Sequence, residues 1–424
     1  MAVAMRTAAA TFGPVFRAVL GPALPVRLRY WDGSADGPDG GPGEVVFHTP
    51  RAMRRFLYSP DEVGLARAYV LEELTIEGDE LELLRILVQA PDDLRVPPRQ
   101  LASAVAGAAR LGVLGLPLAP PPEEVRVRGR RHSLRRDRAA VTHHYDLGND
   151  FYRLVLGPSM AYSCARFVDA GDSLETAQAS KHDLICRKLG LAPGMRLLDV
   201  GCGWGTMAVH AATHYGVDAV GVSISPSQVE LARRRVADAG LDGRVEIRLQ
   251  DYRELAGEGQ RFHGVSSIGM FEHVGRTRMT EYFKVLTDLL EPRGRLLNHA
   301  ISTPEGSVSG EHSFLGRYVF PDGELQDVGV VAEAMQAQGL EIRDVEGLRE
   351  HYPFTLRLWL SNLEGRWDEA VALVGRRRAR IWRLYLMGSI VNFEGAAVGV
   401  HQVLAVRLAD DGSSGMPLTR AAMT

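Results

Sequence analysis

The chain has 424 residues, of which 46% are hydrophobic and 24% are charged, and its formal net charge is −3. These values are ordinary for a soluble globular protein and exclude global disorder, and the length is sufficient for two domains. Because the net charge is close to zero, any attraction to an anionic partner must come from a local patch. The three cysteines, Cys164, Cys186 and Cys202, lack the even number of a disulfide framework and the spacing of a zinc site. They predict no metal and a reducing compartment.

The first 90 residues predict a small α+β domain. Alternating residues at 26–31 indicate a half-buried strand that would pair with 44–48, and three helical patterns follow at 50–58, 61–72 and 79–88. Two roles stay open for this domain: a structural cap, or the docking of a substrate.

No stretch of the sequence approaches the ~20 apolar residues of a membrane span. An alanine-rich run near the start of the chain imitates a signal peptide, but Pro14 and Arg17 interrupt it before an apolar core forms. We therefore expect a cytoplasmic protein that would meet a membrane only from its surface, as a peripheral protein at the inner face.

Residues 91–139 are expected to link two domains, with prolines at 97–98 and 117–122 around an Ala/Gly/Leu segment that would be a surface helix. Two interpretations of the basic run that follows stay open. It is either a solvated surface or a contact with an anionic membrane surface, where each cation contributes roughly 1 kcal/mol. Nucleic acid is disfavoured because the chain lacks a broad basic face with interleaved aromatic residues. The run contains Arg126, Arg128, Arg130, Arg131, Arg135, Arg136 and Arg138.

Residues 140–410 predict an α/β domain, and residues 411–424 a flexible tail. A helix is expected from a capping box at Asp172 to Gly190, and strands alternate with helices thereafter. Repeated β-α units predict an open, mostly parallel, seven-stranded sheet with ligands at the carboxyl ends of its strands. The expected strands lie at 197–200, 219–222, 245–249, 262–270, 294–300, 340–345 and 401–408, and the helices among them at 206–215, 226–239 and 279–290.

A glycine-rich turn follows the first of these strands. Gly201, Gly203 and Gly205 alternate along it directly after Asp199-Val200. Glycine permits positive φ and a close approach of the backbone to a ligand, and the helix N-terminus behind the turn offers free N–H groups. The spacing is Gly-x-Gly-x-Gly and not the dinucleotide fingerprint. It resembles the first motif of class I methyltransferases, which bind S-adenosylmethionine.

Polar residues after the next strands would face the same crevice. Ser223 and Gln228 follow the second strand, Gln250-Asp251-Tyr252 follow the third, and Glu272-His273 follow the fourth. A dehydrogenase usually has an acidic ribose ligand after its second strand, where this chain has Ser223, with Gln228 as a neutral substitute. Dinucleotide binding is disfavoured accordingly.

Five separated motifs, in the same order, closely resemble the cyclopropane fatty acid synthase family of S-adenosylmethionine-dependent enzymes. The resemblance covers roughly residues 140–408 and, more weakly, the N-terminal domain. The motifs are His143-His144-Tyr145-Asp146-Leu147-Gly148-Asn149-Asp150-Phe151-Tyr152 with Met160-Ala161-Tyr162-Ser163-Cys164-Ala165, then Gly269-Met270-Phe271-Glu272-His273-Val274-Gly275, then Leu297-Asn298-His299-Ala300-Ile301, and Tyr318-Val319-Phe320-Pro321-Asp322-Gly323.

The resemblance implies a Rossmann-like class I methyltransferase domain and a reaction at an alkene. Family members transfer the sulfonium methyl group to a cis double bond of an acyl chain, usually on a membrane phospholipid, and a proton then leaves the cationic intermediate. An alkene is a weak nucleophile, so the reaction needs close alignment, a dry cavity and electron-rich walls. The candidate aromatic walls are Tyr145, Tyr162, Tyr252, Phe271 and Tyr352.

The resemblance also implies a bicarbonate ion as the general base. Glu272 beside this anion is reasonable only if one of the pair carries the intervening proton, so a raised pKa is expected for its carboxyl group. By motif, the bicarbonate ligands would be Cys164, Glu272, His299, the backbone N–H of Ile301, and Tyr352. The cofactor ligands would be Tyr162, Ser163, Asp199, Gly201, Gly203, Trp204, Gly205, Ser223, Gln228, Gln250, Asp251 and Tyr252.

Three departures from the family pattern bear on the product. Arg166 replaces an aromatic residue, Glu324-Leu325-Gln326-Asp327 stand where Leu-Pro-Ser is usual, and Phe393-Glu394 replace Phe-Arg. They leave the cofactor and base sites intact but put in doubt how the acyl chain is held. The product is therefore open between a cyclopropane and a methylene chain, with a slight preference for a branch distinct from ordinary cyclopropane synthases. A methylene product would require a reductase partner.

Two other functions remain as alternatives: a methyltransferase for a soluble small molecule, and a non-catalytic lipid-binding relative. The basic segment and the N-terminal domain count against the first, and the retained glycine turn and anion ligands count against the second. The oligomeric state is open, a homo-oligomer included. The arginines at 376–378, 380 and 383 lie among apolar residues and predict either a second membrane contact or a subunit interface.

Overall fold

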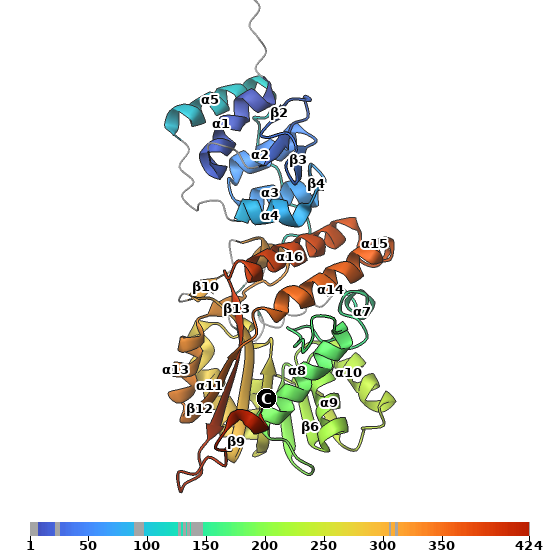
Figure 1. Cartoon of the computed structure of the whole chain (residues 1–424), viewed down its shortest axis with the longest axis vertical. Coiled ribbons are helices and arrows are strands. Elements are labelled where there is room, and N and C mark those ends of the chain that lie inside the picture. The colour runs from blue at the N-terminus through green and yellow to red at the C-terminus, as the bar shows by residue number, and fades with distance from the viewer. Residues whose placement is uncertain are drawn as a thin grey trace, which may run out of the picture. The chain divides into compact units, whose positions relative to one another are not determined.

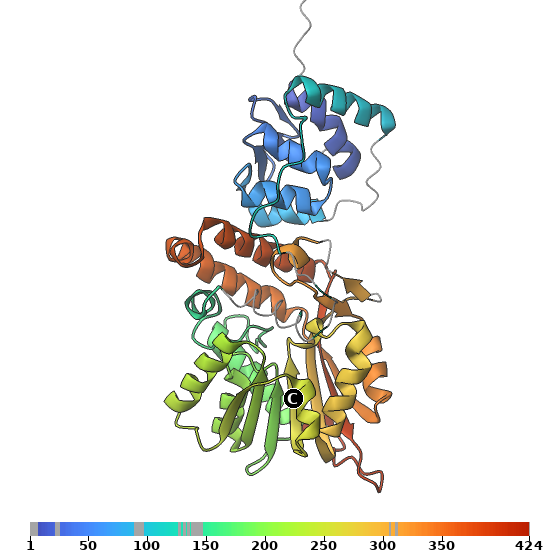
Figure 2. The same cartoon turned by 180° about the vertical axis from the view of Figure 1, so that it is seen from behind.

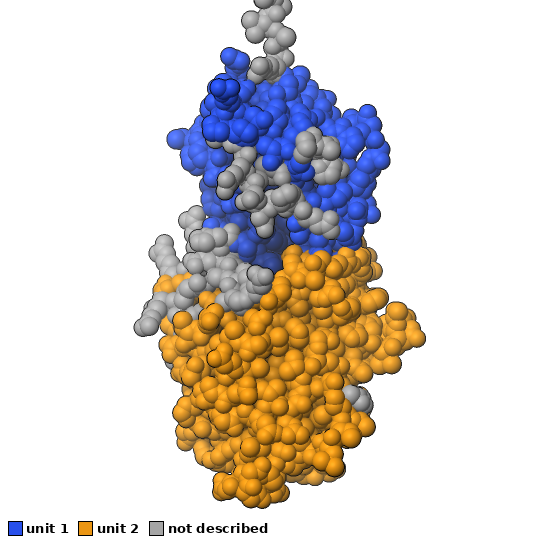
Figure 3. Space-filling view, turned by 60° about the vertical axis from the view of Figure 1, so that its left-hand side comes forward, with its two compact units in different colours: residues 1–125, 312–319, 375–391 blue, residues 126–311, 320–374, 392–424 orange. Residues whose placement is uncertain are grey.

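The computed structural model describes residues 7–21, 26–88, 97–125, 129, 133, 136, 147–304, 307–309 and 313–423. The chain divides into two compact units, coloured blue and orange in Figure 3. Unit 1 comprises residues 1–125, 312–319 and 375–391, and unit 2 comprises residues 126–311, 320–374 and 392–424. This division differs from the predicted one, in which a domain ended at residue 90 and residues 91–139 formed a linker.

Unit 1 contains a small mixed sheet with the strand order β2-β1-β3-β4. The predicted pairing of the first strand with residues 44–48 is present and is parallel, with Leu28 opposite Val45, whereas β3 and β4 are antiparallel. The elements are α1 (Ala8–Leu20), β1 (Arg27–Arg29), β2 (Ala35–Asp36), β3 (Gly43–Phe47), α2 (Pro50–Tyr58), α3 (Glu62–Val70), β4 (Leu74–Gly78), α4 (Glu80–Val88), α5 (Pro98–Arg110), α12 (Phe314–Tyr318) and most of α16 (Arg376–Glu394).

The predicted linker contributes a helix to the core of unit 1. Helix α5 packs against α1 (Figures 1 and 2), and its Ala104 and Ala108 are buried. A Cβ atom at Gly107 would lie 2.4 Å from Thr11, so glycine permits this close approach of the two helices. Helix α1 itself occupies the alanine-rich run that imitates a signal peptide. Residues 97–110 are therefore part of a folded unit, which is a correction to the prediction.

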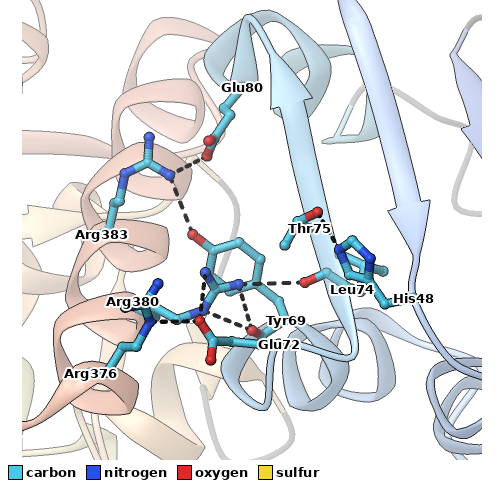
Figure 4. Close-up of polar contacts among 9 residues, drawn as sticks. All are labelled: His48, Tyr69, Glu72, Leu74, Thr75, Glu80, Arg376, Arg380 and Arg383. Carbon is cyan, nitrogen blue, oxygen red and sulfur yellow. Dashed lines mark hydrogen bonds and ion pairs between the residues drawn. The ribbon is translucent and has the colours of Figure 1, made fainter.

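The arginines of α16 form contacts within unit 1 (Figure 4). Arg376 pairs with Glu72 at 2.7 Å, and Arg383 pairs with Glu80. The Arg380 guanidinium donates to the Tyr69 carbonyl at 2.7 and 3.0 Å and lies 4.0 Å above the centre of the Tyr69 ring. These three arginines, which we expected at a membrane or a subunit interface, are thus engaged in packing a late segment of the chain onto an early one.

Unit 2 is built on a twisted sheet whose principal strands have the order β7-β6-β5-β8-β9-β13-β12. Strands β5 to β9 are parallel, and β13 runs antiparallel to both β9 and β12. The strands are β5 (Arg196–Val200), β6 (Asp218–Ser223), β7 (Val245–Leu249), β8 (Phe262–Ile268), β9 (Leu290–Ser302), β10 (Ser307–Ser309), β11 (Glu324–Gln326), β12 (Leu340–Gly347) and β13 (Gly399–Arg407).

Helices cover both faces of this sheet, as the opposite views in Figures 1 and 2 show. Because side chains alternate along β5, Leu197 packs beneath α8, α9 and α10, whereas Leu198 packs on the side of α11 and α13. The helices are α7 (Asn149–Leu156), α8 (Leu174–Leu189), α9 (Thr206–Tyr215), α10 (Pro226–Asp238), η1 (Tyr252–Gly257), η2 (Phe271–His273), η3 (Arg276–Arg278), α11 (Met279–Asp288), α13 (Val328–Gln336), α14 (His351–Gly365), α15 (Trp367–Val374) and η4 (Arg420–Ala422).

Several details of unit 2 differ from the prediction. The described part of the sheet has nine strands, not seven, because β11 continues the line of β8 beside β9 and carries β10. Helix α8 is capped by Ser173, which accepts from the Thr176 N–H at 3.1 Å, and not by Asp172. The expected flexible tail makes contacts: Arg420 pairs with Asp344 at 2.6 Å, and Met423 is buried.

The basic run at 126–138 lies mostly outside the described residues. Of its arginines only Arg136 is described, and it forms a two-pronged ion pair with Asp322, with both N···O distances at 2.6 Å. Arg136 is therefore engaged within unit 2. None of the described helices combines the length and the apolar character that a membrane crossing requires.

Candidate active site

The glycine turn after β5 has the backbone geometry that its sequence predicts. Gly201, Gly203 and Gly205 have φ values of +73°, +53° and +77°, in the left-handed region that disfavours other residues. The N–H groups of Gly201 and Cys202 both donate to the Val222 carbonyl at 3.0 Å, which ties the turn to β6. Gly205 then begins α9, so the turn places a helix N-terminus behind the carboxyl end of the sheet.

A pocket opens at the carboxyl ends of β5, β6, β7 and β8, and the predicted convergence of polar residues is found there. Of the predicted cofactor residues, Gly205 does not line this pocket. Its α-carbon faces Ala232 of α10, and a Cβ there would lie 3.2 Å from the alanine side chain. The predicted cofactor residues that line the pocket are Tyr162, Ser163, Asp199, Gly201, Gly203, Trp204, Ser223, Gln228, Gln250, Asp251 and Tyr252.

Hydrogen bonds hold the polar lining in place. Ser223 donates to the side-chain oxygen of Gln228 at 2.8 Å, at the position where a dinucleotide-binding protein would have an acid. Asp251 pairs with Arg253, with N···O distances of 2.7 and 2.8 Å. Trp204 donates from its ring N–H to Asn149 at 2.8 Å. The pocket thus has an amide after its second strand and a carboxylate after its third.

The predicted aromatic walls divide between the pocket and the core. Tyr162 and Tyr252 line the pocket, and Tyr162 also packs on Trp359, with ring centres 5.5 Å apart. Phe271 packs in the core against Phe283, at 5.5 Å, and does not line the pocket. Tyr352 is discussed below. Tyr145 and the motif at 143–146 lie outside the described residues.

Glu272 and Ile301 are in direct contact. The Ile301 N–H donates to Oε1 of Glu272 at 2.8 Å, so in this structure the predicted anion ligand is already bonded to the carboxylate. Burial raises the pKa of Glu272 to about 7. The direction is the expected one, and its cause in this structure is the lost hydration of the carboxyl group. The second oxygen, Oε2, is buried and has no hydrogen-bond partner among the described residues.

His299 is buried on β9, and one of its ring nitrogens has no partner among the residues that the structure describes. Burial lowers its pKa to about 3, so the ring is neutral. The Gln402 amide nitrogen lies 3.3 Å from Nδ1, and with that amide as donor the ring proton is on Nε2. Within the described part of the chain Nε2 has no partner, so it is a free hydrogen-bond donor.

Cys164 and Tyr352 lie around the start of α14. The Cys164 thiol donates to the Leu348 carbonyl at 3.7 Å, and burial raises its pKa, so it is a neutral thiol. Tyr352, in the first turn of α14, stacks on Phe393 with ring centres 4.2 Å apart. None of the five predicted catalytic residues lines the pocket described above. Among the described hydrogen bonds, none joins Cys164 or His299 to the contact between Glu272 and Ile301.

Comparison with known proteins decides the family. The family model described as mycolic acid cyclopropane synthetase matches residues 132–403. A probable fatty acid methyltransferase of Mycobacterium tuberculosis is 43% identical over 405 residues, which cover 93% of this chain and 94% of the relative. The chain belongs to the cyclopropane synthase family. It is an S-adenosylmethionine-dependent methyltransferase, and this family transfers the methyl group to unsaturated fatty acyl chains.

Other members of the cyclopropane synthase family are similar to part of this chain. The cyclopropane-fatty-acyl-phospholipid synthase of Escherichia coli is 38% identical over 269 residues, which cover 63% of this chain and 68% of that protein. A crystal structure of the mycolic acid cyclopropane synthase CmaA1, complexed with SAH and CTAB, is 32% identical. It has a TM-score of 0.60 and covers 63% of this chain and 98% of that one. This neighbour confirms the predicted class I methyltransferase fold.

The three departures from the cyclopropane synthase pattern have local partners. Arg166 donates to Ser180 at 3.1 Å, and Glu324 accepts from the Arg276 N–H at 2.9 Å. Asp327 caps α13 by accepting from the Gly329 N–H at 2.7 Å. Glu394 pairs with Arg357 of α14. These contacts give each residue a role in the fold of unit 2.

Sequence reasoning missed several pocket residues of this cyclopropane synthase family member, among them two buried basic side chains of α8. Lys181 and His182 line the pocket from α8, and they are 0% and 3% exposed. The signal was present: Gln178 and Lys181 lie three residues apart on the helix face that also carries Ala177, Leu184 and Ile185, all of them buried. Polar residues on a helix face that is otherwise apolar indicate a buried site.

Proposed function

We propose that this enzyme adds a one-carbon unit to the cis double bond of an unsaturated acyl chain on a membrane phospholipid, and that a bicarbonate ion bound beside Glu272 is the base. Family membership supports the transfer of a methyl group from S-adenosylmethionine to an unsaturated acyl chain. The observation that carries the finer proposal is a pair of buried polar atoms without a partner among the described residues, Oε2 of Glu272 and Nε2 of His299.

These two atoms have the hydrogen-bonding character that a small anion carrying one proton would satisfy. A buried polar atom without a partner costs about 1–3 kcal/mol, so a bound group that satisfies both atoms is favoured. An acceptor at Glu272 and a donor at His299 match the hydroxyl and an anionic oxygen of bicarbonate. Both residues are also close to the pocket, because His299 is paired with Ile268 across β8 and β9, and Ile268 and Met270 line it.

The residues of this chain would each have a distinct task. Bicarbonate held there would supply the general base. Glu272, fixed through Ile301, would accept the proton of the anion, and the neutral His299 would donate to it. Tyr352, held by its stack on Phe393, would orient its hydroxyl toward the same anion. Tyr162 and Tyr252 would present electron-rich faces to the positive charge that develops on the acyl chain.

We favour a methylene product over a cyclopropane. Relatives that match nearly the whole chain support this choice: beside the probable fatty acid methyltransferase, the tuberculostearic acid methyltransferase UfaA1 of Mycobacterium tuberculosis is 32% identical over 91% of this chain. A hydride shift from the methyl-bearing carbon to the neighbouring cation, followed by loss of a proton from the transferred methyl group, leaves the exocyclic methylene. Direct loss of that proton with ring closure leaves a cyclopropane. A methylene chain would be the substrate of a reductase.

The test supplies purified enzyme with S-adenosylmethionine and vesicles of a phosphatidylglycerol whose monounsaturated chains carry deuterium on both alkene carbons. We expect the acyl chains to gain one CH₂ by mass spectrometry. A methylene product has both deuterium atoms on one chain carbon, because of the hydride shift, whereas a cyclopropane has one on each of the two ring carbons that come from the chain and none on the bridging CH₂. NMR spectra of the extracted chains distinguish the two.

Each part of the proposal has its own contrary result. Methylation of free unsaturated fatty acid or of a soluble small molecule, with none on vesicles, would contradict the phospholipid substrate. Removal of dissolved carbon dioxide should slow turnover, and added bicarbonate should restore it. A rate that is independent of bicarbonate would contradict the assigned base. Sedimentation of the protein with anionic vesicles, compared with neutral ones, tests peripheral membrane binding.

A further inference from the structure

Helix α8 presents a buried ammonium group to the cofactor pocket. Lys181 is 0% exposed, lines the pocket, and donates from Nζ to the Ser163 hydroxyl at 2.8 Å. A buried lysine is normally paired with a carboxylate, because an isolated charge loses its hydration. Within the described part of the chain no carboxylate forms an ion pair with Lys181. The Ser163 hydroxyl accepts from it, and Asp199 favours its charged form from beyond ion-pair distance.

A buried carboxylate lines the same pocket from β5. Asp199 is 2% exposed and accepts from the Ser266 hydroxyl at 2.7 Å, and it forms no described ion pair with Lys181. Burial raises the pKa of Asp199 to about 6 and lowers that of Lys181 to about 7. The pocket thus holds a basic and an acidic group that form no described ion pair with each other, and each is bonded to a neutral hydroxyl group.

The segment 161–163, which carries the hydroxyl partner of Lys181, is held in place by another residue of α8. Gln178, one turn before Lys181, donates to the carbonyl groups of Ala161 and Ser163 at 3.3 and 3.0 Å. The Ser163 hydroxyl is therefore held over the lysine by the same helix. Burying the lysine removes its hydration, and no ion pair within the described part of the protein offsets that loss of free energy. Such a group is expected where a bound ligand supplies the partner.

We propose that Lys181 binds the carboxylate of the methionyl end of S-adenosylmethionine, with Asp199 facing the amino group of the same end. The ligand end is a zwitterion, and the two buried charges match it in sign. Lys181 is then a cofactor-binding residue that discriminates for the amino-acid end of the methyl donor. The proposal rests on the cofactor of the family and is independent of the acyl substrate and the base.

Affinities of two protein variants for two ligands test this role without any turnover of substrate. Isothermal titration calorimetry measures the affinity of the wild type and of Lys181→Gln for S-adenosylhomocysteine and for its decarboxylated analogue. The wild type should prefer the carboxylate-bearing ligand by at least about ten-fold, since a hydrogen bond to a charged group contributes about 1.5–3 kcal/mol. In Lys181→Gln this preference should fall to within about two-fold.

Lys188→Gln is the matched control. Lys188 lies on the same helix and is equally buried, but it is paired with Asp344 and Glu346 at 3.0 and 2.5 Å and does not line the pocket. That variant should keep the preference of the wild type. Lys181→Met is a second variant, which is expected to fold because it replaces a buried, unpaired charge with an apolar chain of similar length.

The preference of the wild type is decisive by itself. If the wild type binds both ligands equally, the carboxylate has no counter-ion in the pocket and the proposal is wrong. The proposal is also wrong if Lys181→Gln or Lys181→Met keeps the preference of the wild type. A loss of affinity for both ligands by the same factor would reassign Lys181 to the support of the pocket wall.

Discussion

Glu272 accepts the N–H of Ile301 with one carboxyl oxygen at 2.8 Å and leaves the other oxygen buried without a described partner. The first contact fixes the orientation of the carboxyl group, because it joins the short helix after β8 to the end of β9. The second oxygen is then directed by the fold alone and is free to accept a proton from a bound group. This division of tasks between two oxygens of one side chain underlies the first two predictions.

Glu272→Gln should abolish turnover while leaving cofactor binding nearly unchanged. The amide cannot take up a proton, so the base loses its proton acceptor, and we expect a rate at least ~100-fold lower. Glu272 does not line the cofactor pocket, so the affinity for S-adenosylhomocysteine should stay within about two-fold of the wild type. Mass spectrometry of the lipids and calorimetry measure the two quantities. Equal losses of both would reassign Glu272 to cofactor binding.

The stability of the protein should also depend on Glu272. Its pKa is raised to about 7 in the fold, above its value of about 4.5 when unfolded. A raised pKa stabilises the fold fully below about pH 4.5, and that stabilisation is lost as the pH rises through 7. The free energy of unfolding of Glu272→Gln, relative to that of the wild type, should therefore increase between these pH values by on the order of 3 kcal/mol.

Urea denaturation at a series of pH values measures this difference. Glu230→Gln, at an exposed site on α10, controls for the loss of one carboxylate from the surface. Its difference from the wild type should be nearly independent of pH. A flat difference for Glu272→Gln as well would mean that the carboxyl group is hydrated or paired in solution.

Gly201→Ala should damage the pocket more than the fold. Gly201 has a φ of +73°, and a Cβ there would lie 2.7 Å from the Met270 side chain, which lines the pocket. We expect a loss of about 1–2 kcal/mol in stability and of at least about ten-fold in affinity for S-adenosylhomocysteine. Gly240→Ala is the control, because Gly240 has a φ of +67° with no atom within 4 Å of the added Cβ. That variant should lose stability alone.

Arg380→Met should loosen unit 1 locally. The change removes two hydrogen bonds to the Tyr69 carbonyl and the stacking on the Tyr69 ring, which together contribute about 2 kcal/mol. Hydrogen exchange should become faster in α3 and β4. Arg378→Met, at an exposed position of the same helix, should leave these rates unchanged. Unchanged exchange in Arg380→Met would mean that α16 does not stabilise this part of unit 1.

The regular elements of unit 2 were predictable because each one is encoded locally. Strand β7 was predicted at its observed bounds, and β5, β6, β8 and β12 within two residues at either end, since an apolar run between glycine or proline breaks needs no distant partner. The convergence of polar residues at the strand ends also followed, because parallel strands bring their carboxyl ends to one edge. The contact between Glu272 and Ile301 joins two residues that the family resemblance implied as ligands of one anion, and their role as ligands stays a prediction.

The assembly of unit 1 was not predictable from local patterns. The sequence of residues 375–391 predicts a basic amphipathic helix, which could contact a membrane, another subunit or the rest of the chain. The contacts of Arg380 with Tyr69 show that it packs on the early part of the chain. Lys181 was missed for a related reason, because a lysine within a helix is usually solvated and its burial depends on which face packs on the sheet. Long-range packing, and not the periodicity of the sequence, decides both cases.

Unit 1 is assembled from three segments of the chain, the last of which ends at residue 391. During synthesis on the ribosome, residues 1–125 emerge long before α16, so the arginines of α16 become available only when most of the polypeptide has been made. Tyr69, Glu72 and Glu80 would meanwhile lack the partners that Figure 4 shows. Expression of the first 125 residues alone would therefore yield an incomplete unit, and circular permutation or co-expression with residues 375–391 is the sounder route to an isolated one.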